Sequence, residues 1–104
     1  MIIDVTERTF VKEVLESDVP VLISFWASWC GPCRIQGEIL DAFSRDLEAG
    51  KAKICKIDVD TERNLVSEYE IMSIPTMITF KDGKMGAKET GVRNESKLRV
   101  MLGI

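Results

Sequence analysis

One long apolar segment, VPVLISFW at Val19–Trp26, constrains the fold of this chain more than any other feature. Ser24 is its only polar residue. A strand of this kind is hydrophobic on both sides, so other elements must cover both of its faces. The segment therefore predicts the central strand of a sheet that is packed between helices.

The rest of the chain alternates between strand and helix patterns. Runs of β-branched and apolar residues predict further strands at 2–5, 51–60, 75–80 and 85–90, and helical spacing of apolar residues predicts helices at 7–17, 33–50, 64–70 and 94–104. Asp82-Gly83 predicts a hairpin turn before the last strand. The order β-α-β-α-β-α-β-β-α predicts an α/β fold with a mixed sheet of about five strands, flanked by helices on both faces.

Two residues are expected to mark helix ends. Thr6 precedes the first predicted helix, and a threonine side chain can accept a hydrogen bond from the first turn, so we expect Thr6 to be its N-cap. Gly50 follows the second predicted helix and is expected to end it, because glycine readily adopts the left-handed conformation found there.

Length and charge narrow the class of protein. The 104 residues suit a single domain, 1–104, and the net charge of −3 comes without the basic stripe that nucleic-acid binding needs. No apolar run approaches the roughly 20 residues of a membrane helix, and the first residues do not resemble a secretory signal. We therefore expect a cytoplasmic, monomeric protein that binds neither nucleic acid nor membrane.

The motif Cys30-Gly31-Pro32-Cys33 lies where the central strand is followed by a predicted helix. This is the carboxyl end of a strand, the usual place for a site in α/β sheets, and Pro32 suits the first turn of a helix. The unpaired N–H groups and the dipole at a helix N-terminus favour a thiolate at Cys30. Because the spacing also allows the two sulfur atoms to form a disulfide, we predict a redox-active pair, although the chain has no histidine.

Metal binding and burial are the other possible roles for cysteine. A zinc site needs about four good ligands, and this chain offers no histidine and no second Cys-X-X-Cys motif. We therefore expect no metal at Cys30 and Cys33. Cys55 stands alone within a predicted apolar strand and is expected to be a buried, unreactive thiol.

The segment FWASWCGPC at Phe25–Cys33 resembles the active-site segment of the thioredoxin family. The resemblance covers essentially the whole chain and includes Lys56 within KIDVD, the SIPT segment at Ser73–Thr76, FKDG at Phe80–Gly83, and Gly91. A WCGPC motif followed at this distance by IPT is specific, whereas a Cys-X-X-Cys motif alone is not. The resemblance implies a thioredoxin fold and a redox disulfide that needs no bound cofactor.

The resemblance also implies roles for residues around the pair. Gly31, Pro32, Lys56 and Trp29 would support the active site, and Pro75, as a cis proline, would border the dithiol. Trp29, Ile74, Pro75 and Gly91 would form an apolar surface for the substrate, with the main chain of Ile74 pairing with an extended substrate segment. Trp26 is expected to be a packing residue beneath the site.

The mechanism that the resemblance implies uses the two cysteines in turn. Cys30, as a thiolate, attacks the disulfide of a protein substrate, and Cys33, which is expected to be the more buried of the two, then attacks Cys30 and releases the reduced substrate. A separate thioredoxin reductase, linked to NADPH or to ferredoxin, would restore the dithiol.

Two positions depart from the family pattern. Ser24 stands where the family usually has a buried aspartate that helps to deprotonate the second cysteine, and serine cannot act as a base near neutral pH. Lys56 would lose its usual partner, so it would be more exposed, paired elsewhere or lowered in pKa. Glu38 replaces the usual helix-kinking proline. It follows Cys33 by five positions, which places it on a different face of the helix, so we expect an exposed side chain that pairs with Arg34 and not a substitute for the missing aspartate.

Two other functions remain open from the sequence. A disulfide oxidase or isomerase would use the same cysteines, but the Gly-Pro pair between them and the absence of an export signal favour reduction. A thioredoxin-like binding subunit would use only the apolar surface, and the intact WCGPC motif argues against that role alone.

Overall fold

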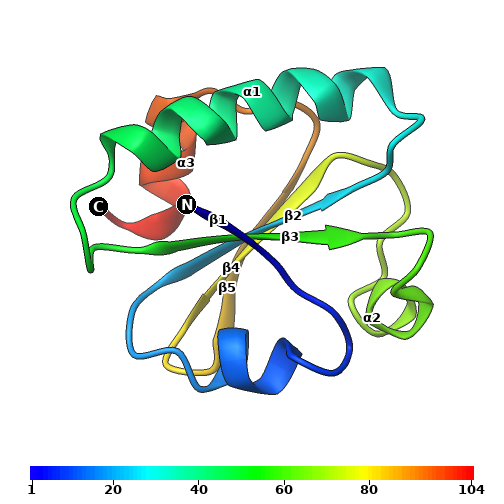
Figure 1. Cartoon of the computed structure of the whole chain (residues 1–104), viewed down its shortest axis with the longest axis horizontal. Coiled ribbons are helices and arrows are strands. Elements are labelled where there is room, and N and C mark those ends of the chain that lie inside the picture. Colours follow the sequence, from blue (N-terminus) through cyan, green and yellow to red (C-terminus); the bar gives the residue numbers. More distant parts are fainter.

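The computed structural model describes all 104 residues, which form a mixed sheet of five strands with helices packed around it (Figure 1). The strand order is β1-β3-β2-β4-β5. β2 pairs in parallel with β3 and antiparallel with β4, so the apolar segment is the central strand, as predicted. The strands are β1 (Ile2–Asp4), β2 (Val21–Trp26), β3 (Lys53–Asp58), β4 (Thr76–Lys81) and β5 (Lys84–Thr90).

Helices cover both faces of this sheet (Figure 1), which confirms the predicted α/β architecture. On one face lie α1 (Gly31–Asp46) and α3 (Glu95–Leu102). On the other lie α2 (Arg63–Glu68) and a short π-helical segment, η1 (Val11–Leu15). None of these helices combines the length and the apolar composition needed to cross a bilayer.

Alternate residues of β2 point to opposite faces of the sheet. Ile23 and Phe25 belong to the apolar cluster beneath η1 and α2, whereas Leu22 belongs to the cluster beneath α1 and α3. Ser24 has the same parity as Leu22, so its side chain points toward α1. Ser24 is only 3% exposed, which places a hydroxyl in the layer between the central strand and this helix.

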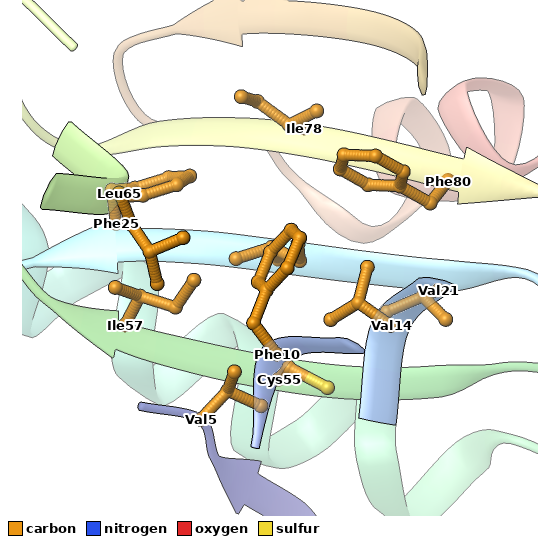
Figure 2. Close-up of a cluster of buried hydrophobic side chains, with 11 residues drawn as sticks. Val5, Phe10, Val14, Val21, Phe25, Cys55, Ile57, Leu65, Ile78 and Phe80 are labelled. Atoms are coloured by element: carbon orange, nitrogen blue, oxygen red, sulfur yellow. The ribbon is translucent and has the colours of Figure 1, made fainter. Parts of the chain in front are cut away.

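The cluster beneath η1 joins residues from three strands, β2, β3 and β4, with residues from η1 and α2 (Figure 2). Phe10, just before η1, and Val14, within it, pack against the sheet. The ring of Phe10 meets that of Phe80 edge to face at a centroid distance of 5.8 Å. Burial of each such large apolar side chain contributes roughly 1.5–3 kcal/mol to the free energy of unfolding. Figure 2 also places the sulfur of Cys55 among these apolar groups.

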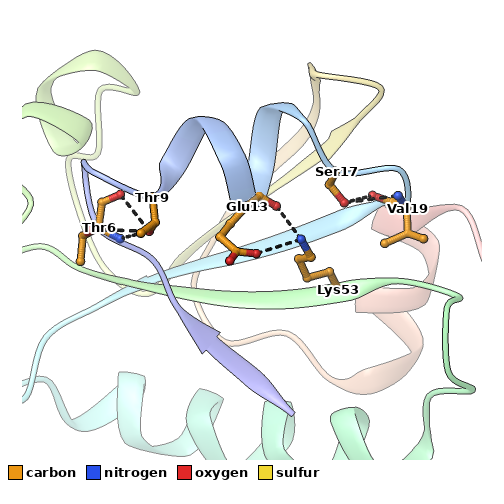
Figure 3. Close-up of polar contacts among 6 residues, drawn as sticks. All are labelled: Thr6, Thr9, Glu13, Ser17, Val19 and Lys53. Carbon is orange, nitrogen blue, oxygen red and sulfur yellow. Dashed lines mark hydrogen bonds and ion pairs between the residues drawn. The ribbon is translucent and has the colours of Figure 1, made fainter.

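The first helix starts later than the sequence predicted, and Thr6 is not its N-cap. The Thr6 N–H donates to Thr9 Oγ1 (3.0 Å) and the Thr9 N–H donates to the Thr6 carbonyl (3.1 Å), so these residues form a turn (Figure 3). Phe10 precedes the helix instead, without a side-chain cap. Lys53 Nζ then donates to both the carbonyl and the carboxylate of Glu13 at 2.9 and 3.1 Å, which ties the helix to β3.

The helix that follows the cysteines also ends before the predicted residue. α1 ends at Asp46, because the Leu47 backbone is already extended (φ −70°, ψ 134°). Gly50 does adopt the left-handed conformation (φ 81°), but it lies in a turn beyond the helix. Pro32 lies in the first turn, as predicted, and the helix continues without a break through Gly37.

The C-terminal third matches its prediction closely. Asp82 and Gly83 have φ values of 53° and 77° and form the tight turn of the β4–β5 hairpin. α3 buries Leu98, Met101 and Leu102 on its apolar face, as their spacing predicts.

Candidate functional site

The two cysteines lie where β2 is followed by α1, and their sulfur atoms form a disulfide. Cys30 is the N-cap of α1, and the N–H of Cys33 donates to Cys30 Sγ at 3.2 Å. The exposed fractions of Cys30 and Cys33 are 7% and 6%, so Cys33 is the more buried of the two, as expected, but only by a small margin. After reduction, the same N–H and the helix dipole stabilise negative charge on Cys30.

One side of the disulfide borders the segment before β4. Cys30 Sγ lies 3.9 Å from the carbonyl oxygen of Ile74, and the peptide bond between Ile74 and Pro75 is cis. The N–H of Gly91 donates to the carbonyl of Pro75 at 2.8 Å. The structure therefore places Ile74 against Cys30 and ties Gly91 to the next residue, Pro75, which is itself buried.

Trp29 projects from the loop before Cys30 and is 70% exposed. Its indole Nε1 donates to Asp60 Oδ2 at 2.9 Å, which holds the ring against the loop that follows β3. Trp29 and Ile74 share the lining of a groove of about 300 Å³ with Met72, which is 92% exposed. Asp60 and Met72 were not identified from the sequence, and nothing in its local pattern singles them out.

The other side of the disulfide borders a pocket of about 420 Å³, here called the Ser24 pocket. It lies between β2 and α1, and two small residues line it: Ser24 on the strand and Gly37 on the helix, where even an added Cβ would meet nothing within 4 Å. Its lining is formed by Ser24, Trp26, Ala27, Ser28, Cys30, Cys33, Arg34, Gly37, Glu38, Leu40, Asp41 and Lys56.

Lys56 pairs with Ser24 in the strand register and lies on the wall of this pocket. Its ammonium group is 4.0 Å from Asp4 Oδ1 and 4.8 Å from the centroid of the Trp26 ring. The Lys56 side chain is 35% exposed, so the charge reaches solvent and needs no buried partner. Trp26 packs against the cysteine pair, as expected, and its buried indole N–H has no acceptor among the protein atoms.

Glu38 is exposed, as expected, but it forms no ion pair with Arg34. The expectation of that pair is wrong. Glu38 instead lines the Ser24 pocket together with Asp41, which was not identified from the sequence. Two carboxylates on α1 therefore border the same pocket as Cys33.

Gln36 is a buried polar residue of α1 that the sequence analysis missed. Its exposed fraction is 0%, and its amide donates to the Arg93 carbonyl (3.0 Å) and accepts from the Arg93 N–H (2.7 Å). These two bonds fix the chain just after Gly91 against the helix that carries Cys33. A glutamine among the apolar residues of the helix was the available signal.

Cys55 has no exposed surface, and its burial raises the pKa of the thiol from 9.0 to about 12; the nearby charge of Lys53 lowers it slightly and that of Glu13 raises it. The prediction of a buried free thiol is confirmed. No group of three or more histidine, cysteine, aspartate or glutamate side chains is placed to hold a metal ion.

This pKa predicts a loss of stability at alkaline pH. An unfolded thiol ionises above pH 9, whereas the folded Cys55 stays protonated until about pH 12. The free energy of unfolding that the buried, protonated thiol contributes is therefore complete below pH 9 and is lost as the pH rises toward 12. The loss is on the order of 3 kcal/mol near pH 11. Urea unfolding of the oxidised protein from pH 8 to 11 measures it. Cys55→Val should show a shallower decline, and equal declines in both proteins would contradict the assignment.

The comparisons with known proteins agree with this site. The family model described as Thioredoxin matches residues 1–103. Curated relatives include Thioredoxin of Rickettsia felis, 46% identical over 91% of this chain and 90% of its own, and Thioredoxin of Pseudomonas aeruginosa, 40% identical over 97% and 93%. Thioredoxin 1 of a Nostoc species is 49% identical over 77% and 74%. The chain belongs to the thioredoxin family and, with its Cys30–Cys33 pair, is a thiol–disulfide oxidoreductase that reduces protein disulfides.

Proposed function

We propose that residues 1–104 form a single thioredoxin domain in which Cys30 is the attacking thiolate and Cys33 the resolving thiol. The observation that carries this assignment is the place of Cys30: its sulfur accepts the Cys33 N–H at the start of α1 and lies 3.9 Å from the Ile74 carbonyl. A substrate that lies along Ile74 therefore meets Cys30 first. Gly31 and Pro32 support this arrangement by connecting the two cysteines within the first turn of the helix.

The reaction follows from these positions. The Cys30 thiolate attacks one sulfur of the substrate disulfide, forms a mixed disulfide and releases the other substrate sulfur as a thiolate. The Cys33 thiolate then attacks Cys30 Sγ, which forms the Cys30–Cys33 disulfide and releases the second substrate thiolate. Two electrons have moved from the protein to its substrate, and both substrate thiolates take up protons.

The substrate surface in this proposal consists of Trp29, Ile74, Pro75 and Gly91. An extended substrate segment would pair with the main chain of Ile74 and add to the protein as a strand does. The groove beside Trp29 and Met72 would take an apolar side chain next to the substrate cysteine, because both groove residues expose apolar surface. Lys56 lies on the opposite side of the disulfide and would act only on charge in the Ser24 pocket.

Thioredoxins work with disulfide-containing proteins and with a thioredoxin reductase, and they hold no prosthetic group. For this chain we propose a cytoplasmic monomer that binds neither nucleic acid nor membrane. Its reductase would draw electrons from NADPH or from ferredoxin. The family and the net charge of −3 support these assignments.

Reduction of insulin tests the proposal. With dithiothreitol as the electron source, the protein should accelerate the precipitation of the released insulin chains at least tenfold over dithiothreitol alone. Replacement of dithiothreitol by an NADPH-linked or a ferredoxin-linked reductase then identifies the electron donor. A protein that oxidises reduced substrates but fails to reduce insulin would be an oxidase, and one that does neither would be a binding subunit.

A further inference from the structure

The resolving step requires Cys33 to lose a proton, and no base lies directly beneath it. Cys33 is 6% exposed, and the β2 residues on its side, Ser24 and Trp26, are neutral. The Ser24 pocket is the space into which the proton can leave, because Cys33 forms part of its wall. The charged groups around this pocket therefore decide how the proton moves.

Four charged side chains border the Ser24 pocket: Arg34, Glu38 and Asp41 from α1 and Lys56 from β3. The two cations repel a proton, and neither carboxylate forms a hydrogen bond or an ion pair with another part of the chain. Glu38 and Asp41 therefore retain free acceptor atoms at the edge of the pocket.

Both carboxylates are separated from the sulfur along the helix and around it. Glu38 and Asp41 follow Cys33 by about 7.5 and 12 Å along the axis, and side chains in a helix lean toward its N-terminus, which here carries Cys33. These spacings are too long for direct transfer. The pocket of about 420 Å³ has room for several water molecules of roughly 30 Å³ each, enough to connect the sulfur with a carboxylate.

We propose that Glu38 and Asp41 accept the Cys33 proton through water in the Ser24 pocket and so replace a buried base. The inference rests on the proposed function, since it concerns the step in which Cys33 resolves the mixed disulfide. The Cys33 S–H bond breaks and its proton passes through water to a carboxylate. The sulfur then bonds to Cys30 Sγ, the bond from Cys30 to the substrate breaks, and the substrate thiolate leaves. The carboxylate returns the proton to solvent or to that thiolate.

Stopped-flow reaction of the reduced protein with dithionitrobenzoate tests the proposal, because it separates the two steps. The first molecule of thionitrobenzoate is released when Cys30 attacks, and the second when Cys33 resolves. In the double variant E38Q/D41N, the second phase should slow on the order of tenfold near pH 6 and converge with that of the native protein at alkaline pH. A direct general base is worth 10²–10⁴-fold, and water left in the pocket makes the expected effect smaller.

The first phase and a matched variant serve as controls for this result. The double variant D46N/E48Q removes the same charge from exposed positions outside the pocket and should behave as the native protein does. Removing negative charge alone would favour the Cys33 thiolate and speed the second phase, so a slowed phase reports proton transfer. Formate should restore the rate of E38Q/D41N by supplying a small carboxylate.

Ser24→Asp provides an independent arm. A carboxylate at this position points toward α1 and should speed the second phase near neutral pH, and it should make that phase insensitive to E38Q/D41N. An unchanged second phase in E38Q/D41N at every pH would overturn the inference while leaving the proposed function intact. Loss of the first phase in the native protein would instead overturn the proposed function.

Discussion

Cys33→Ser is expected to abolish turnover and to trap the substrate on Cys30. The serine hydroxyl cannot attack the mixed disulfide, so the reaction stops after the first exchange. Insulin reduction should fall on the order of 1,000-fold or more, as loss of a catalytic nucleophile does in other enzymes. Mass spectrometry without reductant should show the protein joined to one substrate chain, and dithiothreitol should release that chain.

The other two cysteines provide the controls for this result. Cys30→Ser should lose the same activity but form no mixed disulfide, because the sulfur beside the Ile74 carbonyl, where the substrate would lie, is that of Cys30. Cys55→Ser should keep full activity per folded molecule. If Cys30→Ser trapped substrate and Cys33→Ser did not, the two roles would have to be exchanged.

Gln36→Leu is expected to lower the free energy of unfolding by about 2–4 kcal/mol, which is large for a single side chain of similar size. The substitution leaves both the N–H and the carbonyl of Arg93 without their partners, at 2.7 and 3.0 Å in the native protein. Urea unfolding measures the change. KM for a protein substrate should also rise more than kcat falls. The substitution frees the chain at Arg93, and Gly91 of the substrate surface lies only two residues before it.

Arg45→Leu is the matched control, since Arg45 is exposed on the same helix and makes no hydrogen bond with another residue. It should change stability by less than about 0.5 kcal/mol. Equal losses in the two variants would show that the cost comes from leucine in this helix and not from the two bonds to Arg93.

The parts of the fold that local pattern dictates were predictable. Val21–Trp26 became the central strand because its residues are apolar on both faces, and Leu98 and Met101 became buried because their spacing matches a helix. Thr6 is not the cap because Thr6 and Thr9 close a turn of their own and the helix begins only at Val11, which the helical pattern does not record. Where a turn ends and a helix begins is decided by the geometry of neighbouring residues.

The site was predictable where chemistry is carried by a motif and hidden where it depends on contact between distant segments. Cys30, Pro32 and Cys33 are read directly from their spacing. The bonds of Gln36 cross 57 positions of the chain, and the Ser24 pocket is lined by residues of β2, α1 and β3 that lie far apart in the sequence. Neither follows from periodicity, since both require the packing of α1 on the sheet.

The burial of Cys55 on the opposite face of the sheet has a consequence for a protein that is oxidised in every turnover. The working sulfurs lie at the sheet's end beside α1, while the sulfur of Cys55 is enclosed beneath η1, with strands between them. No third thiol can reach the Cys30–Cys33 disulfide within one molecule, and none is exposed to link two molecules. Because the strands keep Cys55 away from the site, repeated oxidation always forms the same disulfide, Cys30–Cys33.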